Sequence, residues 1–352
     1  MPHRLWALSL TLLFCIPAAS TLPANPKEDG GFYYTYDTLT TLLQQLPTQY
    51  PTLVNVTSLG TTRDHHQLWL ITITDNVTVD EHEPAVLYLG GLHGNEKPGY
   101  QVVITTLLSI LENYTTIHVN ATFTNRIRHI VNTTVLYFIP MANPDGITID
   151  TRKNTRPTNT TFNGVDINRN FPSHWNDFDR HPFRYAFGLF PKLLIHTTVK
   201  YPGLDFLTII HEGTYRGPAP LSENETRAID SFAASHHLTL AVDYHTSGDI
   251  IGYPWFWTKD PTNDTMTYQA LAANISTINH YHVLQGADWY YTLGNFEDWY
   301  YEHYGILSLL IELGPTDSPR YINNQEKISE LCHTHLLVNL YLAEQAQTIG
   351  ET

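Results

Sequence analysis

Cysteine is scarce in this chain, which has only Cys15 and Cys332 among its 352 residues. Cys15 lies in an N-terminal segment that we expect to be removed, so the mature chain keeps one cysteine and forms no internal disulfide. Basic residues are also few, because 19 Lys and Arg face 34 Asp and Glu, for a formal net charge of −15. Without a basic stripe to bind a phosphate backbone, the chain is not expected to bind nucleic acid.

Long apolar runs are equally rare. The run over 5–16 follows Arg4 and precedes small residues up to Ser20, which is the layout of a secretory signal peptide. This run is too short to cross a bilayer, and no later segment approaches the required length. We therefore expect a secreted, extracellular protein, free or held at the cell surface, without a membrane span. Its expected parts are a signal peptide at 1–20, a short segment at 21–32, one folded domain at 33–346 and a tail at 347–352.

Hydrophobic periodicity divides the chain into alternating strands and helices without internal repeats. Apolar runs predict strands over 53–59, 68–74, 85–91, 135–140, 238–245 and 306–313. Helical spacing, with Pro47 after the first helix and a capping box at 222–225, predicts helices over 36–46, 98–112, 222–236, 265–279 and 325–345. Residues 143–190 lose this periodicity, as a long functional loop does. The alternation predicts an α/β sandwich around a mixed, largely parallel sheet.

A histidine and a carboxylate follow the third of these strands. His93 and Glu96 come directly after the run over 85–91, where Gly90 and Gly91 allow a sharp turn. Imidazole nitrogen and carboxylate oxygen are ligands that Zn²⁺ accepts in open catalytic sites. A His-x-x-Glu spacing is common by chance, so an ordinary surface loop is the alternative.

A third ligand is available at the end of another strand. His245 ends the run over 238–245, and ligands gather at the carboxyl ends of neighbouring strands in an open parallel sheet. His93 and His245 share this context, whereas most of the 19 histidines do not. Three protein ligands would leave a fourth position for water. The alternative is that both are ordinary polar residues at strand ends.

Glu312 stands near the end of the apolar strand over 306–313, where an unpaired charge is costly. A carboxylate beside a metal-activated water can take its proton and later pass it to a leaving amine. A salt bridge or a helix contact is the alternative.

Further polar candidates lie in irregular segments. Arg152, Asn168 and Arg169 belong to the non-periodic region, where an arginine fork can bind a carboxylate and another arginine can stabilise an oxyanion. Simple solvation is the alternative for both arginines. Tyr290 is one of 22 tyrosines, most of which must be packing residues.

Together these segments resemble the zinc metallocarboxypeptidase family, over roughly 33–346. The resemblance rests on motifs that follow one another in one order: 93–96 (His-Gly-Asn-Glu), 143–146 (Asn-Pro-Asp-Gly), 152–154 (Arg-Lys-Asn), 164–172, 215–218, 222–226, 243–245 (Asp-Tyr-His), 290 with 294 and 298–299, and 311–314 (Ile-Glu-Leu-Gly). It implies a three-layer α/β/α sandwich around a twisted sheet of about eight strands, active as a monomer on peptide or protein C-termini.

The resemblance also implies a role for each candidate in the reaction. One zinc ion per chain would be held by His93, Glu96 and His245. Glu312 would be the general base and acid, and Arg152 would stabilise the oxyanion. The implied reaction is the attack of a zinc-polarised water on the last peptide bond.

Four residues would bind the substrate. Asn168 and Arg169 would hold its terminal carboxylate, and Tyr290 would close over it. Glu297 aligns with the floor of the family's specificity pocket, where an acid would favour a C-terminal Lys or Arg. Alternatively, Glu297 is a carboxylate at the start of a helix, favoured by the helix dipole.

Other functions stay open at this point. A zinc amidohydrolase acting on peptidoglycan stem peptides or acylated amino acids would use a similar site. A non-catalytic secreted binding protein would keep the fold, although it would have no chemical need for all four residues His93, Glu96, His245 and Glu312. Nine Asn-x-Ser/Thr sequons would accept glycans in a secreted chain.

Overall fold

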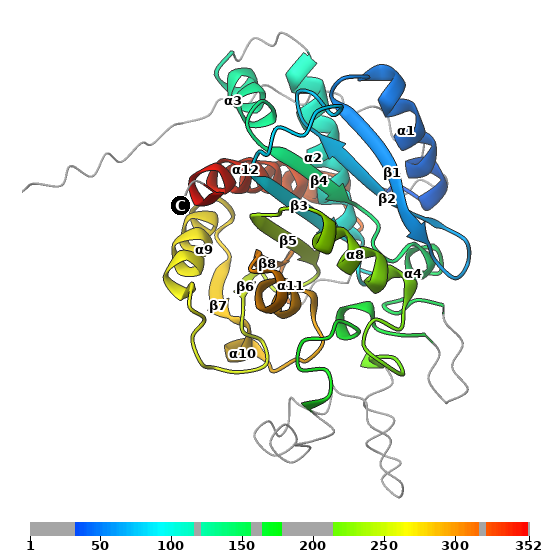
Figure 1. Cartoon of the computed structure of the whole chain (residues 1–352), viewed down its shortest axis with the longest axis vertical. Coiled ribbons are helices and arrows are strands. Elements are labelled where there is room, and N and C mark those ends of the chain that lie inside the picture. Colours follow the sequence, from blue (N-terminus) through cyan, green and yellow to red (C-terminus); the bar gives the residue numbers. More distant parts are fainter. Residues whose placement is uncertain (1–31, 116–120, 156–163, 178–213, 317–321, 351–352) are drawn as a thin grey trace, which may run out of the picture.

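The computed structural model describes residues 32–115, 121–155, 164–177, 214–316 and 322–350 (Figure 1). The expected signal peptide at 1–20, all but the last residue of the 21–32 segment and the end of the chain lie outside these ranges. The strands are β1 (Val54–Thr61), β2 (Gln67–Ile73), β3 (Ala85–Gly90), β4 (Val135–Ile139), β5 (Leu240–His245), β6 (Ile250–Tyr253), β7 (His282–Gln285) and β8 (Leu307–Glu312).

The helices surround these strands. They are α1 (Tyr36–Gln49), α2 (Lys97–Thr115), α3 (Ala121–Val131), α4 (Pro144–Thr148), the 3₁₀ turn η1 (Ile167–Arg169), α8 (Asn224–Ser235), α9 (Thr265–Asn279), α10 (Gly286–Trp289), α11 (Phe296–Tyr304) and α12 (Gln325–Gly350). Within the described ranges, none of them combines the length and the apolar character needed to cross a bilayer.

The described strands form one eight-stranded sheet in the order β1-β2-β4-β3-β5-β8-β6-β7. The pairs β3/β4, β3/β5, β5/β8 and β6/β7 are parallel, and the other three pairs are antiparallel. Every residue of β3, β5 and β8 is buried, which explains why these strands read as nearly continuous apolar runs. The expected mixed sheet of about eight strands is confirmed.

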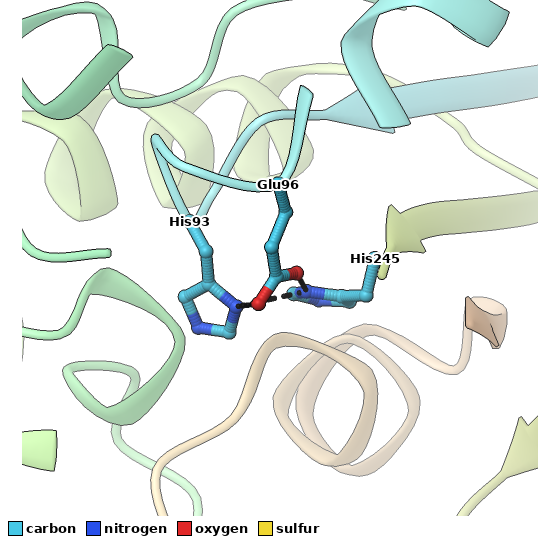
Figure 2. A group of neighbouring side chains, drawn as sticks. All are labelled: His93, Glu96 and His245. Carbon is cyan, nitrogen blue, oxygen red and sulfur yellow. Dashed lines mark hydrogen bonds and ion pairs between the residues drawn. The ribbon is translucent and has the colours of Figure 1, made fainter. Parts of the chain in front are cut away.

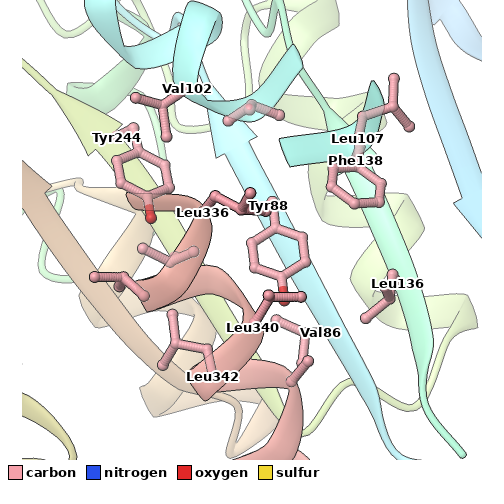
Figure 3. Close-up of a cluster of buried hydrophobic side chains, with 14 of the residues drawn as sticks. Val86, Tyr88, Val102, Leu107, Leu136, Phe138, Tyr244, Leu336, Leu340 and Leu342 are labelled. Atoms are coloured by element: carbon pink, nitrogen blue, oxygen red, sulfur yellow. The ribbon is translucent and has the colours of Figure 1, made fainter. Parts of the chain in front are cut away.

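Helices cover both faces of the sheet, because successive side chains of a strand point to opposite sides. On β3, Val86 and Tyr88 pack into a cluster with residues of α2, α9 and α12, and Figure 3 shows Leu336 and Leu340 of α12 beside them. The alternate residues, 87 and 89, pack into a second cluster with α8 and α11. This arrangement is the expected three-layer α/β/α sandwich.

The strand register brings the candidate site to one edge of the sheet. Gly90 of β3 lies opposite Tyr244 of β5, and His245 lies opposite Glu312 of β8. The turn after β3 packs tightly on the turn at 143–146, because a Cβ on Gly94 would lie 2.1 Å from the carbonyl carbon of Gly146. Only glycine fits there, so the backbone contact holds the turn that carries His93.

Two expectations about helix ends are wrong. α1 continues through Pro47 to Gln49, because in a last turn proline removes one hydrogen bond and the helix closes with Tyr50 N donating to Leu46 O. The capping box at 222–225 does not form. Glu223 is the N-cap of α8 without a side-chain cap, and its amide donates to the side chain of Asn170. A tertiary contact therefore replaces the local one.

Some elements lie outside the sequence-based expectations. β6 and β7 have four residues each, too few for a periodic signal, and β7 lies at the sheet edge with its first two residues exposed. α3 is amphipathic, with four buried residues among eleven. α12 ends at Gly350, five residues beyond the expected end.

His335 of α12 predicts how stability responds to acid. It is 1% exposed, its Nδ1 donates to Leu331 O at 2.9 Å, and burial lowers its pKa to about 4 from the usual 6.5. Between pH 6.5 and pH 4 this histidine is protonated in the unfolded chain and neutral in the folded chain. The free energy of unfolding therefore decreases as the pH falls through this range. Acidic groups with raised pKa values act in the opposite sense, so the informative quantity is the difference from His335→Gln.

We expect the free energy of unfolding of the metal-free wild type to fall, from pH 7 to pH 4.5, by about 2–3 kcal/mol more than that of His335→Gln. Urea denaturation of both proteins at the two pH values measures this difference. Parallel pH profiles would show that His335 is not the responsible group.

Candidate metal centre and active site

Three potential ligand atoms converge where β3 and β5 end (Figure 2). Nδ1 of His93 lies 2.9 Å from Oε1 of Glu96, and Nδ1 of His245 lies 2.9 Å from Oε2 of Glu96. The two Nδ1 atoms are 3.0 Å apart. All three residues are buried, with 1–4% of their surface exposed. The residues that the sequence predicts as metal ligands are therefore neighbours in the fold.

Two buried carboxylates determine how the imidazoles are oriented. Nε2 of His93 lies 3.1 Å from Oδ1 of Asp166, and Nε2 of His245 lies 2.6 Å from Oδ2 of Asp243. Although burial acts the other way, Arg152 holds the pKa of Asp166 well below its usual range, so this carboxylate is ionised. Each carboxylate accepts the Nε2–H of its histidine, which turns the Nδ1 lone pair toward Glu96.

This donor set fits a divalent cation. Two Nδ1 lone pairs 3.0 Å apart, next to a carboxylate, repel each other unless a cation lies among them. Two imidazole nitrogens and one carboxylate oxygen are the ligand types of catalytic zinc sites. Glu96 is further held by the backbone amide of Thr246, at 3.1 Å, and by Nη1 of Arg152, at 3.4 Å.

Glu312 ends β8 directly opposite His245 and is 7% exposed. Burial raises its pKa to about 8, and the negative charge of Glu96 acts in the same direction. A carboxyl group with a pKa near neutrality can both accept and return a proton.

The side chain of Arg152 is bound to Asp166 through Nε at 2.8 Å, yet it keeps 20% of its surface exposed. It can therefore reach a bound molecule.

Asn168 and Arg169 lie in η1, next to the start of α11. Oδ1 of Asn168 accepts from the amide of Phe296 at 2.8 Å, and its Nδ2 lies 3.1 Å from Nε2 of His245. Arg169 is 2% exposed, and within the described ranges its Nε and Nη2 have no hydrogen-bond partner. These two donors are available to an incoming carboxylate.

Tyr290 follows α10 and is half-buried. Burial raises the pKa of its hydroxyl, and the charges of Arg169, Glu312 and Arg152 act on it, so it belongs to the same neighbourhood.

Glu297 lies in the first turn of α11, as the helix-start interpretation expects, but it is fully buried. Burial and the charge of Asp243 raise its pKa to about 7. A surface helix-dipole role does not explain this burial.

Sequence reasoning missed Asp166 and Asp243 as functional residues. Both belong to the quoted motifs, but neither was given a role. The signal was present for Asp243, because it is a charged residue inside an apolar strand, two positions before His245 and hence on the same face. No local signal marks Asp166, because it meets His93 across 73 positions of the chain, and only the folded structure brings the two together.

The family model described as "Zinc carboxypeptidase" matches residues 39–186 and 207–337 of this chain. A zinc carboxypeptidase from Saccharothrix mutabilis subsp. capreolus is 26% identical over 300 residues, which cover 81% of this chain and 63% of the relative. Carboxypeptidase SOL1 from Arabidopsis thaliana is 24% identical over 85% of this chain and 53% of its own length. The chain therefore spans about half to two thirds of the length of these relatives.

Solved structures share the fold. A crystal structure of thrombin-activatable fibrinolysis inhibitor aligns with a TM-score of 0.72 and 18% identity, covering 90% of this chain and 75% of that one. Carboxypeptidase A from Helicoverpa armigera aligns with a TM-score of 0.69 and 18% identity, covering 90% and 73%. At this identity the likeness shows the architecture alone. With most of its length matched by the family model, this chain belongs to the zinc carboxypeptidase family.

Proposed function

We propose that this chain is a zinc-dependent metallocarboxypeptidase that removes the C-terminal residue of peptides or proteins. The observation that carries the proposal is the convergence of His93, Glu96 and His245, with Glu312 opposite His245 on the neighbouring strand. A non-catalytic binding protein has no chemical need for this buried set of charges, which is costly to keep.

Recognition of a free C-terminus is the role we propose for Arg169 and Asn168. Nε and Nη2 of Arg169, which have no hydrogen-bond partner among the described residues, form a fork that matches a carboxylate. Asn168 is fixed beside it by the amide of Phe296. Tyr290, whose electrostatic neighbours are Arg169, Glu312 and Arg152, would close over the bound residue.

The reaction would be hydrolysis of the last peptide bond. Held by His93, Glu96 and His245, zinc would act as a Lewis acid that polarises the scissile carbonyl and makes water more acidic. Glu312 would take a proton from the attacking water and give it to the leaving amine. Arg152, oriented by Asp166, would stabilise the negative charge that develops on the carbonyl oxygen.

A preference for basic C-terminal residues is the finer part of the proposal. Glu297 is fully buried, and its carboxylate lies close to Asp243 and His245. The cationic side chain of a C-terminal Lys or Arg would pair with this buried carboxylate.

We also propose that the protein is secreted. The layout of residues 1–20 supports a signal peptide, and among the described residues no sequon asparagine is buried. Asn55 and Asn132, which lie close to strand-like runs, are exposed.

A panel of peptides that differ only at the C-terminus tests the activity. We expect mass spectrometry to show loss of single residues from free C-termini, faster for Arg than for Phe, and no loss from the same peptides with a C-terminal amide. A chelator should stop the reaction, and added zinc should restore it. Equal cleavage of the amidated peptides would rule out Arg169 as a carboxylate clamp, and release of stem-peptide or acyl-amino-acid products alone would favour an amidohydrolase.

A further inference from the structure

The loop that joins β5 to β6, residues 246–249, passes over the end of β8. In the sheet β8 lies between these two strands, and Glu312 is opposite both His245 of β5 and Ile250 of β6. The loop packs closely against the proposed general base, because a Cβ on Gly248 would lie 3.2 Å from the Cβ of Glu312. The conformation of this loop therefore limits where the carboxyl group of Glu312 can lie.

Hydrogen bonds tie the same loop to the turn that follows β8. The turn is at Gly314, whose φ of 77° is a left-handed conformation that suits glycine. The carbonyl oxygen of Gly314 accepts from the amide of Gly248 at 2.6 Å and from the amide of Asp249 at 2.9 Å. Residues 246–249 and 312–314 thus form one hydrogen-bonded unit, which we call the β8 cap.

One side chain from outside completes the β8 cap. The phenol oxygen of Tyr281 accepts from the amide of Gly314 at 3.2 Å, and the phenol donates its hydrogen to the carboxylate of Asp249. Burial raises the pKa of the phenol, so it keeps the hydrogen that it donates. Gly314 is buried, and a buried amide without a partner is costly. The phenol is therefore bonded to both halves of the β8 cap.

Tyr281 is itself held in place from the side of α9. Its amide donates to Oδ1 of Asn279 at 3.1 Å, and its carbonyl oxygen accepts from Oγ of Ser276 at 2.7 Å. Its ring packs on the buried imidazole of His335, with 5.3 Å between the ring centroids, and the residue is 9% exposed. Because backbone and ring are both fixed, the phenol occupies a defined position before any substrate arrives.

We propose that Tyr281 is a positioning residue for Glu312, because its phenol holds the β8 cap in the conformation that keeps this carboxyl group beside the metal ligands. The inference rests on the proposed exopeptidase function and adds to it a residue outside the site. The phenol bonds to Gly314 and Asp249, so it acts through the cap and not on the substrate. A general base transfers protons only within hydrogen-bond reach, so a small displacement of Glu312 lowers the rate.

A purely stabilising role for Tyr281 makes a different prediction. Loss of a buried hydrogen bond lowers the free energy of unfolding wherever it occurs, but it changes turnover only where a catalytic group depends on it. Tyr301 offers a matched comparison, because its phenol accepts from the amide of Asp264 at 3.3 Å and donates to the carboxylate of Asp264 at 2.7 Å. Tyr301 is also 9% exposed, and neither residue belongs to the β8 cap.

The experiment compares wild type, Tyr281→Phe, Tyr301→Phe, Glu312→Gln and the double variant Tyr281→Phe with Glu312→Gln. Steady-state hydrolysis of a peptide with a free C-terminus gives kcat and KM of the full-length zinc enzyme, and metal analysis gives its zinc content. Hydrogen exchange of the metal-free protein, followed by mass spectrometry, reports on segments 246–250 and 311–315 independently of activity. Thermal unfolding checks that each variant is folded.

In Tyr281→Phe we expect kcat to fall about tenfold or more, because a displaced base loses its reactive geometry. KM should stay within about twofold of the wild-type value, and the zinc content should be unchanged. Exchange in the two segments should be faster, since the amide of Gly314 loses its acceptor. Tyr301→Phe should equal wild type in kcat, KM, zinc content and exchange of these segments.

The double variant tests whether the phenol acts through Glu312. If it does, adding Tyr281→Phe to Glu312→Gln should change kcat little, because the group that the phenol positions is already inactive. If Tyr281→Phe does not fold, Asp249→Gly takes its place. Glycine tolerates the φ of 51° at this position, and the substitution removes the carboxylate that accepts from the phenol, so the same fall in kcat is expected.

Three results would overturn this inference alone. Wild-type kcat in zinc-loaded Tyr281→Phe would show that Glu312 does not depend on the phenol. A fall in kcat that adds in full to that of Glu312→Gln would place the effect elsewhere in the site. Loss of zinc together with activity would make Tyr281 a support of the ligands and not of the base. By contrast, no release from any C-terminus by the wild type would refute the proposed function and the inference with it.

Discussion

Replacing Glu312 with glutamine is expected to lower kcat/KM by about 10²–10⁴-fold, the range that general acid–base catalysis contributes. The substitution keeps the shape of the side chain but removes its ability to accept a proton from water. Because the pKa of Glu312 is raised to about 8 by burial and by Glu96, the wild-type group is suited to both halves of the proton transfer. The measurement is steady-state hydrolysis of a peptide with a free C-terminus.

Metal content decides how the result for Glu312→Gln is interpreted. Glu312 is not among the three converging ligands, so the variant should keep the zinc of the wild type and should bind a competitive product with similar affinity. Glu326→Gln, at an exposed position in the first turn of α12, is the matched control. Full activity of Glu312→Gln with bound zinc would remove Glu312 from the mechanism.

Replacing His245 with alanine is expected to abolish zinc retention and, with it, activity. The side chain supplies one of three ligand atoms, and without it Asp243 would be a buried carboxylate that has lost the Nε2–H donor of His245. We expect stoichiometric zinc in the dialysed wild type and about 10²-fold or greater loss of affinity in the variant. Metal analysis after dialysis against a weak chelator measures it.

A histidine elsewhere on the chain controls for the loss of an imidazole. His282, exposed on the edge strand β7, lies away from the converging ligands, and His282→Ala should retain the metal. Equal zinc content in wild type and His245→Ala would contradict the ligand assignment.

The central part of the fold could be predicted from the sequence because its strands are buried on both faces. β3, β5 and β8 give apolar runs that end at His93, His245 and Glu312, and parallel strands bring such ends to one edge. β6 and β7 gave no signal, since four residues cannot establish a period. Such short strands depend on the neighbours that pair with them, which a local pattern does not contain.

The polar surroundings of the site were harder to predict than its ligands. Asp166 meets His93 across 73 positions, and Phe296 N meets Asn168 across 128, so the partners of these groups depend on tertiary packing. Asp243 was detectable as a charge within an apolar strand, but its closeness to Glu297 appears only once α11 is packed on the sheet. The roles expected for the loop residues Arg152, Asn168 and Tyr290 came from the family resemblance, whereas their contacts are visible only in the structure.

The wide sequence separation of the ligands has a consequence for biogenesis. Glu96 and His245 are 149 positions apart, and they meet only after β5 has joined β3. One short segment therefore supplies only two of the three ligands, His93 and Glu96, and the third arrives from a distant strand, in contrast to metal-binding loops formed by one short segment. Zinc uptake would then be one of the last events of maturation, and occupancy would report that the central strands have assembled correctly.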